Sequence, residues 1–374
     1  MLFFIGIILG LLNLIDFGTF GLGEFFLIII LFFSNFMKKG NNKTNYIIYL
    51  KNNFNSELFK IGLFIIFLIG YFFWTNISKS FVIKDVVKWL TIFTEMFLIN
   101  KSLNNNKKII DLLISFMLFS KLSEYHTFNT IYSLHYFFII PIFNLLYIKN
   151  KSNNYKYLLY LICLIYFFIG KSRSALILLM IYIAYEWANF VLINLISKKF
   201  NNKIKALGVI FLFIVGSIFS IQYIKSNTSL STESNNERRI LIQIVFEEFK
   251  THPILGVGPI NFNNYAQNTL GYRLRNNQLT PHNLYLEILS ENGIIGFMLF
   301  LNILSILFRI IKKQNLDFSV KFSALYILVY YMFSTFTGTN RIVFTILFAV
   351  VSYEYYRMIG AEHYEQNISD CTYI

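Results

Sequence analysis

The feature that most restricts the fold of this chain is a series of apolar runs that recurs from one end to the other, many of them about 20 residues long. Charged residues make up only 14% of the 374 residues, against about 25% in a typical soluble domain. A water-soluble surface cannot be built from this composition, so we expect an all-α polytopic membrane protein. About twelve transmembrane helices are expected, at residues 2–15, 21–37, 61–78, 81–99, 109–122, 131–148, 157–170, 174–196, 206–224, 294–311, 319–336 and 341–359.

The excess of basic residues, which gives a formal charge of +14, predicts the topology and not a nucleic-acid partner. The bases lie in short loops between apolar runs, as the positive-inside rule expects. One alternating set of loops holds 18 Lys and Arg residues: 38–60, 101–108, 149–156, 198–205 and 312–321. The other set holds 7: 16–20, 79–88, 120–130, 170–173 and 337–341. This division predicts that both termini are cytoplasmic.

The same alternation predicts three segments. Residues 1–224 would form transmembrane helices 1–9, residues 225–293 a long outer loop, and residues 294–374 transmembrane helices 10–12 with a short cytoplasmic tail. The outer loop has six bases and six acids, so no excess of positive charge holds it inside.

Two short amphipathic helices are predicted in the outer loop. In ERRILIQIVFEEFKTHP, apolar residues recur at helical spacing, and Pro253 is expected to end the helix because the residue before a proline avoids the α conformation. In the following HPILGVGPINF, Gly256 and Gly258 permit positive φ in a tight turn. TPHNLYLEILSENG is expected to form the second helix and to end at Gly293. Such helices would lie against the membrane surface or cap a cavity. The apolar positions of the first helix are Leu241, Ile244, Val245, Phe246 and Phe249.

Several common chemistries find no support in the motifs. GVGPIN lacks the third glycine and the βαβ unit of a dinucleotide site, and no Walker lysine or GxSxG is present. The five histidines form no pair at metal-ligand spacing. We therefore expect no metal and no cofactor.

Acidic residues in or near the apolar runs are a separate signal: Glu24, Glu95, Asp111 and Glu186. Ionisable groups are costly in hydrocarbon and often functional, so this set would suit a proton-coupled transporter. The ordinary explanation for each is an interhelical hydrogen bond or a position near the membrane surface, and we favour that explanation.

The cations expected on the outer face point to a different chemistry. Arg173 lies at the outer end of the eighth run, Arg238 and Arg239 begin the first loop helix, and Arg341 opens the last run. Singly, each would be an ordinary interfacial anchor, but a cation such as Arg238 at a helix N-terminus opposes the macrodipole. His282, at the N-terminus of the second loop helix, is expected to be neutral and able to accept a proton. Cations beside a neutral histidine suit a reaction on an anionic, lipid-linked substrate.

The compound pattern resembles the signature of the O-antigen ligase/polymerase superfamily. It comprises HPILGVGPINF, then PHNLYLEILSENGIIGFMLFL, with KSRSA upstream and ERR about 15 residues before HP. The resemblance covers residues 171–300, and the first 150 residues match only as generic spanning helices.

The resemblance implies a metal-independent, inverting membrane glycosyltransferase of the GT-C type in the bacterial inner membrane, with its active site on the outer face. Its substrates would be a glycan donor linked to undecaprenyl pyrophosphate and a glycan acceptor, and a chain-length regulator is a further candidate partner. By the family pattern, Arg173 and Arg238 contact the pyrophosphate and His282 acts at the acceptor hydroxyl. Arg239 is the alternative to Arg238, because the family pattern has one arginine here and can be aligned with either residue of the doublet. Arg341 rests on topology alone.

Within this superfamily we predict a surface-polysaccharide (O-antigen or capsule) polymerase, and three alternatives stay open. A ligase would deliver the finished glycan to the lipid A core, and the shared motifs do not distinguish the two. A transporter or flippase of lipid-linked glycans would depend on Glu95 or Glu186 and be indifferent to His282. A non-enzymatic scaffold of polysaccharide assembly would tolerate loss of the arginines and the histidine alike.

Overall fold

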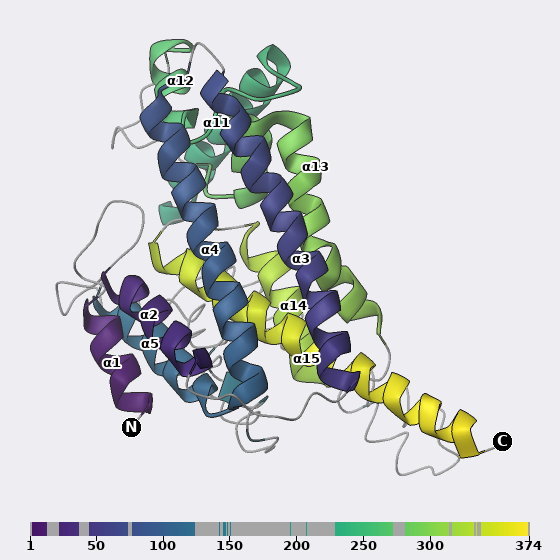
Figure 1. The fold of residues 1–374 in the computed structure, drawn as a ribbon. Helices are drawn as coiled ribbons and strands as arrows, with labels where there is room; N and C mark the ends of the chain where they lie inside the picture. The colour runs from purple at the N-terminus through teal and green to yellow at the C-terminus, as the bar shows by residue number, and fades with distance from the viewer. Residues whose placement is uncertain are drawn as a thin grey trace. The chain divides into compact units, whose positions relative to one another are not determined.

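The computed structural model describes two separate compact units of the chain, and Figure 1 draws its elements. One unit comprises residues 1–160 and 241–374, and the other comprises residues 161–240. The residues described are 2–12, 22–36, 45–73, 77–123, 142, 145, 146, 148, 150, 195, 207, 229–271, 281–313, 316–332, 334 and 338–372. All regular secondary structure in these ranges is helical, which confirms the expected all-α class for this part of the chain.

The helices follow one another along the chain in the order labelled in Figure 1. They are α1 (Leu2–Leu12), α2 (Leu22–Phe36), α3 (Asn45–Gly70) with a 3₁₀ turn η1 (Tyr71–Phe73), α4 (Lys79–Asn105), α5 (Ile109–Ser123), α11 (Ser229–Thr251), α12 (Phe262–Asn268), α13 (Leu284–Lys312), α14 (Phe318–Tyr330) and α15 (Gly338–Thr372).

Three described segments are long and apolar enough to cross a membrane: Asn55–Phe73, Leu284–Lys312 and Asn340–Glu362. They overlap the expected spans at 61–78, 294–311 and 341–359. Two shorter apolar helices lie at Leu22–Phe33 and Ser319–Tyr330. The expected spans at 157–170, 174–196 and 206–224 lie almost entirely outside the described residues, so the total of twelve stays a prediction.

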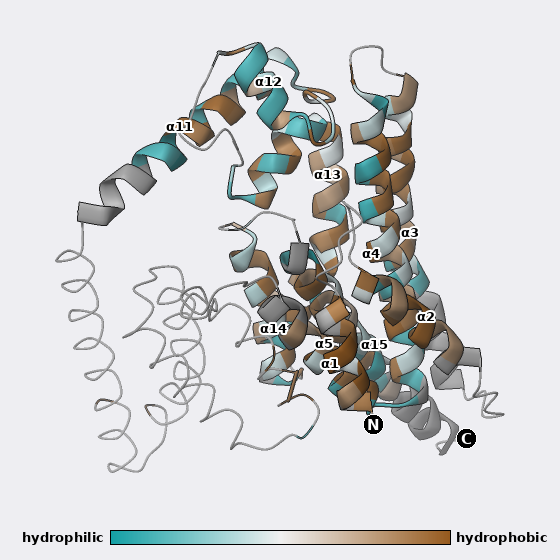
Figure 2. Ribbon diagram, turned by 90° about the vertical axis from the view of Figure 1, so that its left-hand side faces the viewer, coloured by the Kyte–Doolittle hydropathy of each residue, from teal (hydrophilic) through white to brown (hydrophobic). Residues whose placement is uncertain are grey.

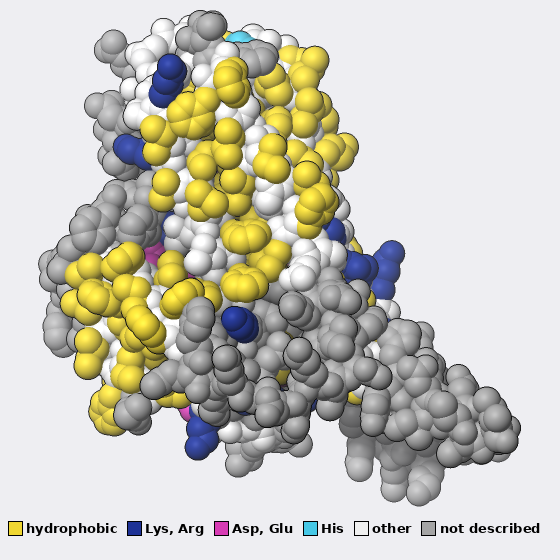
Figure 3. All heavy atoms as spheres, viewed as in Figure 1, with side chains coloured by type: hydrophobic (Ala, Val, Ile, Leu, Met, Phe, Trp, Pro, Cys, Tyr) yellow, Lys and Arg dark blue, Asp and Glu magenta, His cyan; other side chains and the backbone are white. Residues whose placement is uncertain are grey.

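The first unit has an apolar outer face as well as an apolar interior. α3 packs against α4, α13 and α15. Inside, the Trp89 ring lies 4.6 Å from the Phe64 ring and 6.2 Å from the Phe300 ring, which joins three helices. Outside, large apolar side chains are exposed at seven-residue intervals, and Figure 3 shows the hydrophobic surface that they help to form. Such a continuous apolar surface suits contact with lipid. These exposed residues are Phe59 and Ile66 of α3, Phe73 of η1, and Ile83, Leu90 and Phe97 of α4.

α13 folds back on itself at Gly293, which has φ 61° and ψ −165° inside an otherwise helical segment. The Tyr285 ring lies 6.0 Å from the Phe300 ring. Fifteen residues of straight helix would separate these positions by about 22 Å, so the two arms must lie side by side. The expected end of a short helix at Gly293 is therefore confirmed. The arm from Ile294 to Lys312 is about 28 Å long, close to the thickness of the hydrocarbon core.

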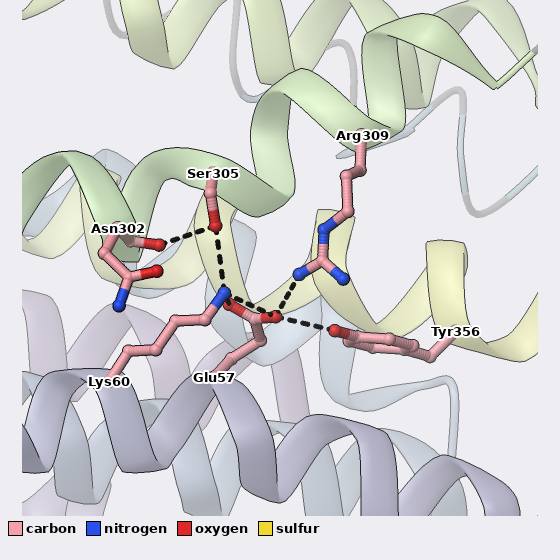
Figure 4. Close-up of polar contacts among 6 residues, drawn as sticks. All are labelled: Glu57, Lys60, Asn302, Ser305, Arg309 and Tyr356. Atoms are coloured by element: carbon pink, nitrogen blue, oxygen red, sulfur yellow. Dashed lines mark hydrogen bonds and ion pairs between the residues drawn. The ribbon is translucent and has the colours of Figure 1, made fainter.

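A buried carboxylate ties three helices together (Figure 4). Its partner Arg309 lies near the end of the long α13 arm that is away from Gly293. Glu57 of α3 accepts hydrogen bonds from Lys60 Nζ at 3.0 Å, from the Tyr356 hydroxyl of α15 at 2.7 Å, and from the Arg309 guanidinium of α13. Lys60 also donates to Ser305 Oγ at 2.9 Å. Two cations and a hydroxyl thus offset one buried charge, which makes this cluster a fixed point of the helix packing.

Candidate active site

His282 lies immediately before the short arm of α13, as the sequence predicts. α13 begins at Leu284, and Asn283 is its N-cap, with a side chain that accepts a hydrogen bond from Leu286 N at 3.1 Å. His282 is exposed and has φ 48°, a left-handed conformation that is uncommon for a residue with a side chain. The site residue that the sequence assigns to proton transfer therefore stands at a helix start in a strained backbone.

The two motifs that carry the superfamily resemblance pack directly against each other. The turn at residues 252–261 donates Val257 N to Ser290 O at 2.9 Å and Gly258 N to Glu291 O at 2.8 Å. Gly256 and Gly258 have φ values of 73° and 102°, which confirms the expected positive φ at both. A Cβ on Gly293 would lie 2.6 Å from Gly256 N, so only glycine permits this approach. The turn thus clamps the α13 hairpin where it reverses; Figure 2 shows polar residues gathered in this region around α12.

The same turn contacts the end of α3. The hydroxyl of Tyr71 in η1 donates to Leu255 O, and a Cβ on Gly258 would meet the side chain of Ile77. The connection between α3 and α4 and the turn after α11 therefore lie at one end of the first unit, together with Gly293.

Glu248 of α11 is a buried carboxyl that the sequence did not single out. It is fully buried, and neither oxygen has a hydrogen-bond partner of good geometry among the described residues, although Ser290 lies beside it. Burial raises the pKa of Glu248 from 4.5 to about 9, and the neighbouring Glu291 carboxyl adds to the rise. The first loop helix otherwise buries Leu241, Ile244 and Val245 as expected, but Phe246 is exposed.

We expect Glu248→Gln to stabilise the protein in alkaline solution. Because the pKa is higher in the folded state, the wild type loses stability as pH rises from about 4.5 to about 9, by about 3 kcal/mol at pH 7. Glutamine keeps the shape and cannot ionise. Fluorescence-detected melting in detergent should give the variant a higher Tm than the wild type at pH 8.5, and a much smaller difference at pH 5. The exposed neighbour Glu247→Gln is the control, and an equal gain from both variants would contradict the assignment.

The structure corrects the expected position of Arg238 and Arg239. α11 begins at Ser229, so the doublet lies inside the helix and not at its N-terminus, and the expected conflict with the macrodipole does not arise. Both arginines are exposed. α11 ends at Thr251, two residues before Pro253, as predicted. Arg173 lies outside the described residues.

Arg341 has a different environment from the one that topology suggested. Its exposed fraction is 3%, and its guanidinium binds both carboxylate oxygens of Glu24 in α2. An arginine on the surface of a substrate site would present its guanidinium to solvent, whereas this one forms a buried ion pair between α2 and α15. For Glu24 the ordinary explanation of an intramembrane acid, an interhelical hydrogen bond, therefore holds.

Tyr331 links the start of the short α13 arm, beside His282, to the start of α15, which carries Arg341. Leu284 N donates to Tyr331 O at 2.9 Å, and the Tyr331 hydroxyl donates to Asn340 O. The N-terminus of α13, the C-terminus of α14 and the N-terminus of α15 therefore meet beside the histidine.

Among the described residues, the other acidic side chains show no grouping typical of a metal site. Glu95 is buried in α4, and Glu186 lies outside the described residues. Within the described ranges, no three His, Cys, Asp or Glu side chains are grouped so that they could hold a metal ion.

Comparison with known families bears on the segment that contains these residues. A family model described as O-antigen ligase matches residues 158–301. The matched segment includes Arg173, the whole of α11, the turn and His282. A search of curated proteins found no match to this chain. The family match confirms the resemblance: over residues 158–301 the chain is similar to the O-antigen ligase family.

Proposed function

We propose that this protein is a membrane glycosyltransferase that polymerises oligosaccharide repeat units carried on undecaprenyl pyrophosphate. The observation that carries the proposal is the position of His282, exposed and strained at the start of the short α13 arm, inside the segment that matches the O-antigen ligase family. A strained backbone conformation that is held by surrounding structure is typical of functional sites.

The proposed reaction is an inverting glycosyl transfer. The acceptor hydroxyl attacks the anomeric carbon as the bond to the pyrophosphate oxygen breaks, and His282 takes the hydroxyl proton. Negative charge grows on the leaving pyrophosphate, and the guanidinium groups of Arg173 and Arg238 would stabilise it through paired hydrogen bonds. Arg239 is the substitute for Arg238. We leave Arg341 out of the donor site because its guanidinium is bound to Glu24.

The contacts of the first unit support an outward-facing site. Loops that are rich in bases contact α15 from its middle onward: Lys107 lies 4.0 Å from Glu354, and Lys313 lies 2.7 Å from Glu362. The Glu57 cluster lies at that same end. The turn at 252–261 lies at the other end, beside Gly293. This grouping supports the predicted alternation, with the base-rich end in the cytoplasm.

Cysteine labelling tests this orientation. In a background with Cys163→Ser and Cys371→Ser, we expect Asn264→Cys to react with an impermeant maleimide on intact cells and Asn104→Cys to be protected. Both positions are exposed, so both should react once detergent is added, which controls for reactivity. Labelling of Asn104→Cys on intact cells would reverse the scheme.

The lipid-linked glycans of a deletion strain test the function. A strain without a polymerase should accumulate single repeat units on the lipid carrier. A strain without a ligase should accumulate full-length lipid-linked chains. An unchanged profile would contradict both, and donor trapped on the cytoplasmic face would favour a flippase.

A further inference from the structure

Two hydrogen bonds hold the backbone at the start of α13: a capping bond to the Asn283 side chain and a bond from Leu284 N to Tyr331 O. Asn283 has extended φ and ψ of −153° and 110°, and its side-chain oxygen accepts from Leu286 N at 3.1 Å. Leu284 N, the first amide of the helix, donates to Tyr331 O at 2.9 Å. Two of the amide groups that a helix N-terminus leaves without internal partners are therefore used to fix the residues directly after His282.

The anchor is itself rigid. Tyr331 is buried, its hydroxyl donates to Asn340 O, and its ring lies 5.3 Å from the Phe344 ring, edge to face. The Tyr285 hydroxyl adds a second link between the same two helices by donating to Leu328 O at 2.8 Å. The last turn of α14 is thus a fixed support for the first turn of α13.

His282 depends on this arrangement because its conformation is not one that it would adopt freely. A non-glycine residue with φ 48° is strained, and this conformation persists only when its surroundings impose it. The next residue in the chain is Asn283, whose extended backbone and capping side chain mark where the helix starts. If the cap is lost, the first turn of the helix can fray and the imidazole can leave its position.

We propose that Asn283 is a positioning residue for His282. It holds the imidazole at the acceptor hydroxyl through the capping bond to Leu286 N, without touching substrate. This inference rests on the proposed function, since it needs His282 to take part in the transfer. The proposed role requires only a side-chain oxygen that can accept the bond from Leu286 N. Variants that keep or remove this oxygen therefore test it.

The test compares three variants of the full-length protein in proteoliposomes, with lipid-linked oligosaccharide purified from the deletion strain as substrate. Asn283→Ser keeps a capping oxygen and should retain close to the wild-type kcat. Asn283→Ala removes the acceptor and should lower kcat on the order of 10- to 100-fold, with the KM for the donor unchanged, because a small misplacement of a catalytic group affects the chemical step. Asn283→Gln keeps the amide but reaches too far to cap, so it should behave like the alanine variant.

Asn264→Ala, an exposed asparagine on α12, is the matched control and should have no effect. Equal kcat for the alanine and serine variants would overturn the proposal, and so would a serine variant as slow as glutamine. A rise in donor KM at constant kcat would also overturn it, because the residue would then act in binding. Failure of the proposed function is distinct from all of these, since the wild-type protein would then transfer no glycan.

Discussion

Replacing His282 by alanine is expected to lower glycan transfer by about 10²–10⁴-fold while the protein still inserts, folds and binds its donor. The side chain is exposed, so its loss leaves no cavity in the core. The donor pyrophosphate is assigned to the arginines, so donor affinity should persist. The loss should therefore fall on kcat, which is the expected result when a general base is removed.

The lipid-linked glycans of cells with this variant separate the two acceptor classes as well. Single repeat units on the lipid carrier would indicate a polymerase, and full-length chains would indicate a ligase. His252→Ala is the matched control, because His252 is exposed on the same segment, where its Nδ1 pairs with the Thr251 hydroxyl. A wild-type glycan profile from His282→Ala would reduce the histidine to a residue beside a helix cap and would reopen the transporter alternative.

The lysine variants of the donor arginines are expected to lose most of their activity although they keep the charge. Lysine is a point charge and cannot make two parallel hydrogen bonds to phosphate oxygens. For Arg173→Lys and Arg238→Lys we expect a loss on the order of 10²-fold in kcat/KM, by analogy with removal of one donor from an oxyanion hole. The measurement is transfer to a defined acceptor at equal protein level.

Arg239→Lys decides the register of the doublet, because Arg238 and Arg239 are both exposed on α11. Only one of the two lysine variants should be strongly impaired. Lys250→Arg, a conservative change at an exposed base of the same helix, is the control. Near-normal transfer from both doublet variants would leave these arginines as interfacial anchors.

Helix ends and tight turns could be predicted from the sequence because they depend on local backbone chemistry. Pro253 limits α11, and Gly256, Gly258 and Gly293 adopt positive φ, since proline and glycine restrict or free the backbone wherever they stand. The location of His282 before a helix follows from the same signals. The start of α11 could not be predicted as well, because the polar residues from Ser229 onward are compatible with either a cap or a helix.

Long-range pairing could not be predicted in the same way. Glu24 and Arg341 are separated by 317 positions, and no local pattern indicates that they form one ion pair. The burial of Glu248 was hidden because two adjacent glutamates on an amphipathic helix suggest an exposed face. The reversal at Gly293 was predicted as a helix end, but the contact between the two arms depends on the Tyr285 and Phe300 rings and on the clamp by the 252–261 turn.

The most direct test of the central claim is the release of undecaprenyl pyrophosphate by purified protein in proteoliposomes that contain only the lipid-linked repeat unit. The account predicts one released carrier for each new glycosidic bond with the wild-type protein, and almost none with His282→Ala. Glycan extension by His282→Ala at the wild-type rate would contradict the account, as would wild-type protein that moves the lipid-linked glycan across the bilayer without releasing any carrier.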